Sequence, residues 1–387
     1  MNRTDNLRRT RGGERGQALI ILTMAVAGVM AMGALIVDGG NAMAHQRATQ
    51  NASDAASLAG ATTLVENMSG AARTDADVLN AVTASFAANN TTFDSAEYVD
   101  YAGNVVGQVG AGGSIPSSAG GVRAHGMRNF PTYLSGIIGL GSATTAAQAT
   151  ALGGSMAGGC AAVEGCAISP VTYSIPIRVC DGTNRPLRLG EHWPLTDLAT
   201  AESGDTSTMS IVPLCTNGPG GVGWLDLAAL GCPGTNLEDW VTTPCNKSFD
   251  IPVWLKTKSG NMNSVDAALN STYKGKIMLI PLFDSTCKAV PSSGQPQDCT
   301  DPGQGDNLWY HIPKFAAFYL HSSYVSGNNA TACNSLPGQP AGGGNGSTTC
   351  LKGWFVNFIT VGPVGPPQPC VSAEGCVDTV FSVQLVR

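Results

Sequence analysis

The chain has 387 residues, which is enough for two or more domains with hydrophobic cores of their own. Only 12% of the residues are Asp, Glu, Lys or Arg, whereas glycine and proline are frequent, with 49 and 22 residues. This composition predicts many turns and short strands. The net charge of -6 leaves no dominant basic surface for binding phosphates, so the sequence argues against nucleic acid as a partner.

The N-terminal part contains a candidate transmembrane helix. Residues 1–15 form a basic segment with two acidic residues and five arginines, namely Arg3, Arg8, Arg9, Arg11 and Arg15. A run of 20 uncharged, mostly apolar residues follows at 18–37, and as a helix it is about 30 Å long, the thickness of the hydrocarbon layer of a bilayer. The positive-inside rule then predicts a cytoplasmic segment at 1–15, a transmembrane helix at 16–37, and everything from Asp38 onward outside the cytoplasm.

A cleavable secretory signal is the alternative interpretation of this segment. Ala42-Met43-Ala44 offers an A-x-A cleavage site just after the apolar run. The apolar region of a signal peptide is typically about 7–15 residues long, shorter than the run at 18–37. The sequence therefore favours a membrane anchor.

The cysteines support export independently. All 12 lie in the last part of the chain and no C-x-x-C spacing occurs, which is typical of disulfides in an oxidising compartment rather than of zinc or thiol-redox sites. Cys160 with Cys166, and Cys370 with Cys376, share the pattern C-x-x-x-E-G-C and are the predicted local pairs. The disulfide candidates are Cys160, Cys166, Cys180, Cys215, Cys232, Cys245, Cys287, Cys299, Cys333, Cys350, Cys370 and Cys376.

The segment from Asp38 to about Glu66 continues the helix. It contains no proline, and alanines recur on one face, as Ala48, Ala52, Ala55 and Ala59. Together with the apolar run it predicts one helical rod of about 70 Å. Such a stripe of small residues allows close packing against a neighbouring membrane helix, and it equally allows packing against a sheet of the same protein.

The remaining elements predict an α+β fold in two regions. Residues 38–155 form a membrane-proximal α+β region, with a helix at 75–88 opened by a Thr74/Asp77 capping box, strands at 98–109, 121–127 and 142–151, a glycine- and serine-rich hairpin loop at 110–121, and a short helix at 130–140. Residues 156–387 form a disulfide-rich, mainly-β ectodomain, with strands at 173–179, 249–255, 276–283, 315–320, 353–361 and 380–386, a helix at 261–270, and an exposed loop at 338–348.

No motif predicts a catalytic residue, a metal or a cofactor. Residues 218–223 fit G-x-G-x-x-G, but the match contains a proline and lies among the cysteines, so a plain turn is favoured. The histidines are scattered, with none of the spacings of a metal site, at His45, His125, His192, His311 and His321. Asp298, Asp301 and Asp306 lack the spacing of an EF-hand.

The N-terminal residues resemble the module of the Flp pilus-assembly TadE/TadG-like family. The resemblance rests on Arg15-Gly-Gln-Ala-Leu19, the apolar run, Val37-Asp38 with Gly40, and QRATQNASDAASLAGA at 46–61; weaker likeness continues at 223–227, 315–318 and 353–356. It implies a single-pass protein of the bacterial cell membrane whose partners are the lipid bilayer and other pilus assembly membrane proteins or pilins.

The sequence departs from true prepilins of this class, which usually carry Glu at the fifth position after the cleaved glycine. Counted from Gly16 that position is Ile21, and counted from Gly13 it is Ala18. The resemblance therefore implies a non-enzymatic, membrane-anchored component of a Tad/Flp-type pilus assembly and secretion system, whose extracytoplasmic domain binds a partner or the envelope. A surface adhesin using the same anchor is the alternative, and an extracytoplasmic hydrolase ranks third.

Overall fold

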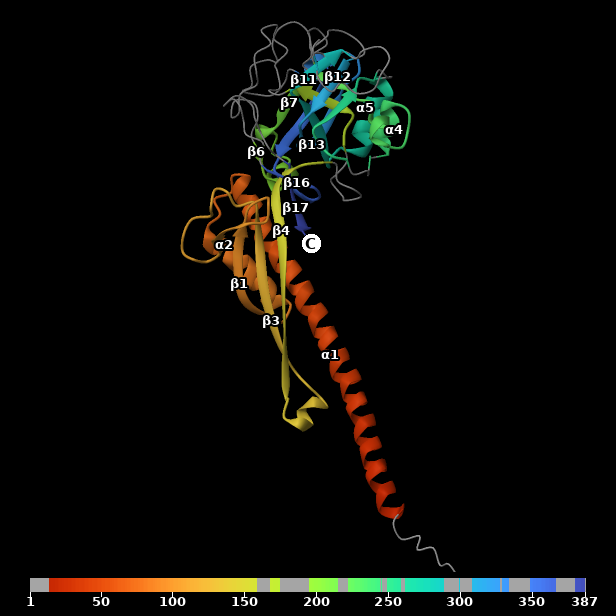
Figure 1. The fold of residues 1–387 in the computed structure, drawn as a ribbon. Helices are drawn as coiled ribbons and strands as arrows, with labels where there is room; N and C mark the ends of the chain where they lie inside the picture. The colour runs from red at the N-terminus through yellow and green to blue at the C-terminus, as the bar shows by residue number, and fades with distance from the viewer. Residues whose placement is uncertain are drawn as a thin grey trace, which may run out of the picture.

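The computed structural model forms two sheet-based units, with a long helix extending from one of them (Figure 1). It describes residues 14–158, 168–174, 195–214, 222–243, 245, 249–258, 262–288, 299, 308–327, 329–333, 349–366 and 380–386. We call residues 14–158, with the strands after residue 357 that join their sheet, the helix–sheet unit, and the remaining sheets and helices the cysteine-rich unit. The predicted α+β fold, with an extended N-terminal helix and a disulfide-containing C-terminal region, is confirmed.

Helix α1 (Glu14–Met68) is a single helix of 55 residues, as the uninterrupted pattern predicts. No proline breaks its hydrogen bonding, and alanine and other good helix formers are abundant along it. None of its most apolar 18-residue stretch is buried against the rest of the protein. The apolar half therefore projects away from the sheet, whereas the second half packs on strands and on α2 (Figure 1).

Helix α2 (Asp75–Ala88) begins and ends where the sequence predicts. The Thr74 hydroxyl accepts a hydrogen bond from the Asp77 N–H, and the Asp77 carboxylate accepts one from the Thr74 N–H. Val78, Val82 and Phe86 are buried on one face of the helix. They lie in one cluster with residues of α1 and of the first sheet, so the periodic apolar face fixes where α2 packs.

The first sheet differs from the prediction in its early strands. Its first members are β1 (Thr92–Val99), β2 (Val105–Gln108), β3 (Gly121–Pro131) and β4 (Ser142–Met156). The predicted strand at 98–109 is wrong because a turn breaks it, in which the Asp100 carboxylate accepts hydrogen bonds from the N–H groups of Ala102 and Asn104. The predicted strand at 142–151 is present and is longer than expected.

The glycine- and serine-rich segment after β2 is not a hairpin loop. Both β2 and β3 pair with β1, so the segment connects the two flanking neighbours of a central strand. The Asp75 carboxylate accepts hydrogen bonds from the N–H groups of Gly110 and Gly112 and from the hydroxyl of Tyr98. One carboxylate at the start of α2 thus fixes the first turn of this loop.

The predicted helix at 130–140 is mostly wrong. Strand β3 continues to Pro131, and only η1 (Ser135–Ile138), one turn of 3-10 helix, lies between β3 and β4. The two strands pair in antiparallel register from Gly121 with Leu152 to Pro131 with Ser142. They form a long hairpin that runs beside α1 (Figure 1).

The end of the chain returns to the first sheet. Strands β15 (Phe358–Val361), β16 (Val364–Gly365) and β17 (Val380–Val386) join it, giving the order β15-β17-β4-β3-β1-β2 with β16 also on β4. The sheet therefore does not follow the boundary predicted between residues 155 and 156. Strand β17 pairs with β4, although the two strands lie more than 200 residues apart in sequence.

The cysteine-rich unit contains a seven-stranded and a three-stranded sheet in the described residues. The larger sheet has the order β6-β14-β13-β10-β5-β8, with β7 also on β14, and comprises β5 (Val171–Ser174), β6 (Leu195–Thr196), β7 (Ser210–Pro213), β8 (Val222–Trp224), β10 (Ile277–Phe283), β13 (Lys314–Tyr324) and β14 (Cys350–Val356). The smaller has the order β11-β12-β9 and comprises β9 (Val253–Lys256), β11 (Ser285–Lys288) and β12 (Leu308–Ile312).

Short helices cover the cysteine-rich unit: α3 (Leu198–Glu202), η2 (Thr206–Thr208), η3 (Leu227–Leu230), α4 (Leu237–Thr242), α5 (Met262–Thr272) and α6 (Ala330–Cys333). The helix predicted at 261–270 corresponds to α5. The strands predicted at 276–283, 315–320 and 380–386 are present as β10, β13 and β17. The strand predicted at 353–361 is wrong as one element, because β14 and β15 belong to different sheets.

The predicted strands at 173–179 and 249–255 share a proline at the fourth position, and only the first extends beyond the described residues. Strand β5 covers the start of the first, and residues 175–179 lie outside the described residues. The second begins at Val253 rather than at Phe249, after a cis peptide bond between Ile251 and Pro252. The loop predicted at 338–348 also lies outside the described residues.

Candidate functional site

A row of polar side chains on α1 faces the β3–β4 hairpin, and we call it the polar ladder. These residues lie three to five positions apart, which keeps them on one side of the helix. Asn41 donates to the Pro131 carbonyl at 3.1 Å, Gln46 to the Ala146 carbonyl at 3.1 Å, and Ser53 to the Ala147 carbonyl at 3.1 Å. The Thr49 and Thr145 hydroxyls lie 3.0 Å apart and are buried, so the ladder ties helix and hairpin together over several turns.

Asp38 ends the polar ladder at the tip of the hairpin. Its carboxylate accepts hydrogen bonds from the N–H groups of Tyr133 at 2.8 Å, Leu134 at 3.1 Å and Ser135 at 2.6 Å, and from the Ser135 hydroxyl at 2.6 Å. The Ser135 hydroxyl and N–H, followed by the Tyr133 N–H, lower the pKa of Asp38 to about 2, against a smaller opposing effect of burial. The first charged residue after the apolar run is therefore an ionised anchor for the hairpin tip.

The sequence alone did not reveal this role of Asp38. The charge marked only the end of the apolar run, because its hydrogen-bond partners lie more than 90 residues away in the chain. A local pattern cannot identify a pairing of that kind. The aromatic contact of His45 with Phe130, stacked at 4.3 Å between ring centroids, was missed for the same reason.

The predicted alanine stripe lies at the edge of the contact between α1 and the rest of the helix–sheet unit. Ala52 is fully buried in a cluster with Val78, Val82 and Phe86, so it packs within the protein. Ala48, Ala55 and Ala59 are half-buried. The contact of Ala52 is with this protein's own elements, whereas a contact of the other three alanines with a neighbouring helix stays a prediction.

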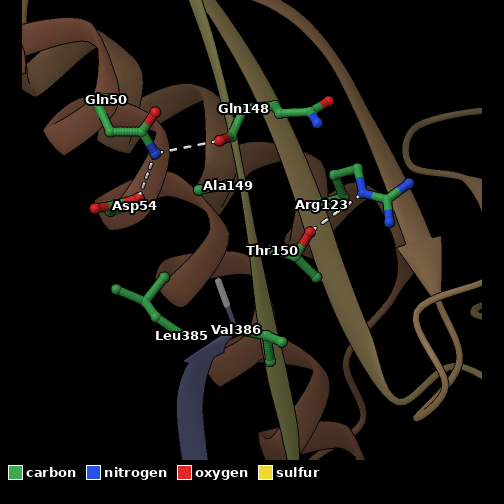
Figure 2. A pocket seen from close by; sticks show the side chains of 8 residues that line it. All are labelled: Gln50, Asp54, Arg123, Gln148, Ala149, Thr150, Leu385 and Val386. Atoms are coloured by element: carbon green, nitrogen blue, oxygen red, sulfur yellow. Dashed lines mark hydrogen bonds between the residues drawn. The ribbon is translucent and has the colours of Figure 1, made fainter.

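A polar groove of about 400 Å³ lies beside the ladder, between α1, β3, β4 and β17 (Figure 2). Gln50 donates to the Asp54 carboxylate at 2.8 Å and to the Gln148 carbonyl at 3.2 Å, and Arg123 donates to the Thr150 hydroxyl at 3.2 Å (Figure 2). No histidine or cysteine lines the groove in the described part of the chain. Its polar groups hold α1, β3 and β4 together, and we assign it no chemistry.

A smaller cavity of about 210 Å³ contains the arrangement closest to a catalytic one. His311 Nδ1 lies 2.7 Å from Asp284 Oδ1, and the imidazole packs on Trp254 with ring centroids 5.0 Å apart. A carboxylate that orients an imidazole is part of a catalytic triad. It also links neighbouring strands here, because Asp284 directly precedes β11 and His311 lies in β12, which pairs with it. This pair is where the hydrolase hypothesis can be tested.

The other predicted motifs carry no site in the described residues. His125 lies 3.9 Å from Glu97, and His321 packs edge-on against Trp354 while burial and nearby lysines lower its pKa. In the described ranges, no group of three or more His, Cys, Asp or Glu residues is placed to hold a metal ion. Of the remaining candidates, Gly223 lies in β8, whereas His192 and residues 218–221, 298, 301 and 306 lie outside the described residues.

Six of the twelve candidate cysteines are described, and each forms a disulfide. The pairs are Cys232–Cys245, Cys287–Cys299 and Cys333–Cys350. The two local pairs predicted from the repeated C-x-x-x-E-G-C pattern lie outside the described residues, as do Cys180 and Cys215. The oxidising environment that the cysteine pattern predicts is consistent with these three bridges.

The part of α1 that carries the apolar run and the polar ladder matches a known family model. Its description is "Putative Flp pilus-assembly TadE/G-like", and the match covers residues 16–63. We call residues 16–63, which are similar to this family, the TadE/G-like module. The family resemblance inferred from the sequence is confirmed for this segment, which lies wholly within α1. No curated protein and no solved structure matches the chain.

Proposed function

We propose that this protein is a non-enzymatic, single-pass membrane component of a Tad/Flp-type pilus assembly and secretion system. The observation that carries the proposal is the match of the TadE/G-like module to residues 16–63. The module coincides with one continuous helix, whose apolar half is long enough to cross a bilayer and whose other half is tied to the sheet by the polar ladder. The chain thus connects a membrane helix rigidly to a folded unit.

The N-terminus lies in the cytoplasm and the two folded units lie outside it in this proposal. Five arginines precede the apolar run, and the disulfides of the cysteine-rich unit form in an oxidising compartment. A reporter enzyme that works only outside the cytoplasm, fused after Arg387, should be active. Activity of a cytoplasm-dependent reporter at the same position would contradict the orientation.

The apolar run acts as an anchor and not as a cleaved signal. The possible cleavage site at Ala42-Met43-Ala44 lies inside α1. Cleavage after Ala44 would remove Asp38 and Asn41, and the N–H groups of Tyr133, Leu134 and Ser135 would lose their carboxylate partner. The hairpin tip therefore depends on the intact helix.

The partners in this proposal are other pilus assembly membrane proteins or pilins, and the cysteine-rich unit presents the surface that binds a partner or the envelope. Deletion of the chain should abolish surface fibres in electron micrographs, and the full-length chain should restore them. Intact fibres combined with impaired attachment to surfaces would instead favour the adhesin, which uses the same anchor.

The non-enzymatic part of the proposal is tested at the Asp284–His311 pair. In the deletion strain, we expect chains with His311→Gln or Asp284→Asn to restore fibres as well as the unchanged chain does, because the pair links two strands. Correctly folded variants that fail to restore fibres would favour the hydrolase hypothesis. Folding is checked by the amount of protein in membranes and by its disulfide content.

A further inference from the structure

The tip of the β3–β4 hairpin exposes apolar side chains beside the end of the apolar run. We propose that this tip, residues 132–141, rests in the surface of the same bilayer that α1 crosses and so forms a second, non-spanning lipid contact. The inference goes beyond the proposed role in pilus assembly, but it rests on the membrane span of α1.

The position of the tip follows from Asp38. The apolar run ends at Val37, and its 20 residues match the hydrocarbon thickness of about 30 Å, so Asp38 is placed where hydrocarbon gives way to headgroups. The Asp38 carboxylate holds the N–H groups of Tyr133, Leu134 and Ser135 at 2.6 to 3.1 Å. The end of the hairpin lies beside α1 (Figure 1). The tip is therefore fixed at the depth of the headgroups, where α1 leaves the bilayer in this proposal.

The composition of the tip suits this depth. Tyr133 is 63% exposed, Leu140 60% and Leu134 36%. Tyrosine is enriched where membrane meets water, and leucine gains by entering the boundary between headgroups and acyl chains. No Asp, Glu, Lys or Arg occurs from residue 129 to residue 163, so no charge of the hairpin itself opposes this position.

Several backbone N–H groups of the tip are already paired, which lowers the cost of bringing them near lipid. Thr132 N–H donates to the Gly141 carbonyl at 3.2 Å, and Leu140 N–H donates to the Ser135 carbonyl at 3.0 Å. The next N–H groups along the chain donate to Asp38, whose charge they compensate. An unpaired backbone N–H is costly in hydrocarbon, and this turn avoids that cost for the N–H groups named.

Lipid is favoured over a protein partner because the exposed side chains continue an exposed apolar surface of the span. Leu35 and Ile36, one turn before the contact with the hairpin, are 77% and 75% exposed. A span and a tip that both contact the same bilayer fix the tilt of α1, and with it the direction in which the cysteine-rich unit points. Such a contact requires no further protein.

Photo-crosslinking of the full-length chain tests the proposal. The photoreactive residue p-benzoylphenylalanine replaces Tyr133 or Leu140, one position at a time, and the chain is inserted into vesicles of phosphatidylethanolamine and phosphatidylglycerol. Both side chains are exposed, so the replacement leaves the core unchanged. After illumination, mass spectrometry of peptides shows whether each position carries a lipid or a protein adduct.

Two further positions serve as controls. Leu35 lies in the span and should give lipid adducts, whereas Val105, which is 47% exposed, should give only background adducts. Val105 pairs with Val99, which pairs with Gly121 at the start of β3, so it lies ten strand residues, or about 30 Å, from the tip. We expect severalfold more lipid adduct at Tyr133 and Leu140 than at Val105.

Two results would overturn the proposal alone: lipid adducts at Leu35 without adducts at Tyr133 and Leu140, or protein adducts at these tip positions in cells. The second result would assign the tip to a protein partner. Absence of lipid adducts at Leu35 as well would contradict the membrane span itself, and the proposal would fail together with it.

Discussion

Glycine and alanine of α1 let neighbouring elements approach closely in the core of the helix–sheet unit, whereas aromatic side chains pack on one another in the core of the cysteine-rich unit. In the first, Gly60 of α1 lies so close to β3 and α2 that an added Cβ would come within 2.8 Å of Val82 and 3.0 Å of Val122. In the second, Phe318 and Phe355 pack edge to face at 4.8 Å between ring centroids. In the helix–sheet unit, close approach of the backbones lets side chains of α1 form hydrogen bonds with β3 and β4. In the cysteine-rich unit, aromatic side chains fill the space between short strands.

The same contrast extends to covalent links. All twelve cysteines and all six tryptophans lie at or beyond residue 160. The helix–sheet unit therefore depends on close packing and the polar ladder, and the cysteine-rich unit adds disulfides to its core. The two units should respond to different perturbations, which makes the contrast testable.

Reduction of disulfides should have the largest effect and should act on the cysteine-rich unit. Cys232–Cys245, Cys287–Cys299 and Cys333–Cys350 close segments of 13, 12 and 17 residues, and loss of each should lower the free energy of unfolding by about 3 kcal/mol. Urea unfolding followed by tryptophan fluorescence, with and without reductant, measures this change, since every tryptophan lies beyond residue 160.

Amide hydrogen exchange of β3 provides the control for this experiment, because β3 contains no cysteine. Its protection should remain unchanged under reducing conditions in which the tryptophan transition shifts. An equal loss of protection in β3 would show that the two units unfold together. It would contradict their stabilisation by different interactions.

An added methyl group at Gly60 should have the next largest effect, in the helix–sheet unit. Gly60→Ala gains about 0.5–1 kcal/mol of helix preference but forces Val82 to move, at a cost of about 1–3 kcal/mol, so we expect a net loss of about 1 kcal/mol. Gly40→Ala in the same helix meets no atom within 4 Å and should be neutral or stabilising. The free energies come from exchange protection in β3 and β4; equal effects of both changes would contradict the close packing.

Loss of one hydrogen bond of the polar ladder should lower the free energy of unfolding by a smaller amount. Thr49→Val removes the buried hydroxyl contact with Thr145 while keeping the shape of the side chain, and should cost about 1 kcal/mol or less. Thr62→Val is the matched control, because the Thr62 hydroxyl donates only within α1, to the Leu58 carbonyl. If amide hydrogen exchange at Thr145 is equally fast in the two variants, the polar ladder does not stabilise the hairpin.

The smallest effect is the acid response of the hairpin tip. The pKa of Asp38 is lowered from 3.8 to about 2, so the ionised form favours the folded tip. This contribution is complete above pH 4 and is lost as the pH falls through about 2. Exchange protection of Tyr133 and Ser135 should therefore persist at pH 4 and decline near pH 2. In Asp38→Asn the decline near pH 2 should disappear; if it persists there, another group causes it.

Elements with a long local pattern could be predicted from the sequence. The apolar run followed by alanine spacing gave α1, and the Thr74/Asp77 capping box with three apolar residues at four-residue spacing gave α2. The break between β1 and β2 was missed although its signal was present, since Asp100, Gly103 and Asn104 are typical turn residues. Because apolar residues stand on both sides of this turn, their pattern alone predicts one strand.

Contacts between distant segments could not be predicted. Nothing local indicates that Val380–Val386 pairs with β4, or that Asp38 binds the N–H groups of Tyr133 and Ser135. Strand register and side-chain partners are set by the three-dimensional packing of segments that lie far apart in the chain. The fold class and the family of the first helix could therefore be predicted from the sequence. The hydrogen bonds between Asp38 and the hairpin tip could not.

In the proposed function, the chain stays in the membrane as an assembly component and does not enter the fibre. Ile21 stands where true prepilins of this class usually carry Glu, and an apolar side chain cannot pair with the amine that cleavage after Gly16 would create. Peptide mapping of the N-terminus, in membranes and in sheared fibres from the same cells, tests this directly. We expect a chain that retains its arginine-rich segment in the membrane fraction only; a chain that begins at Gln17 in the fibre fraction would contradict the account.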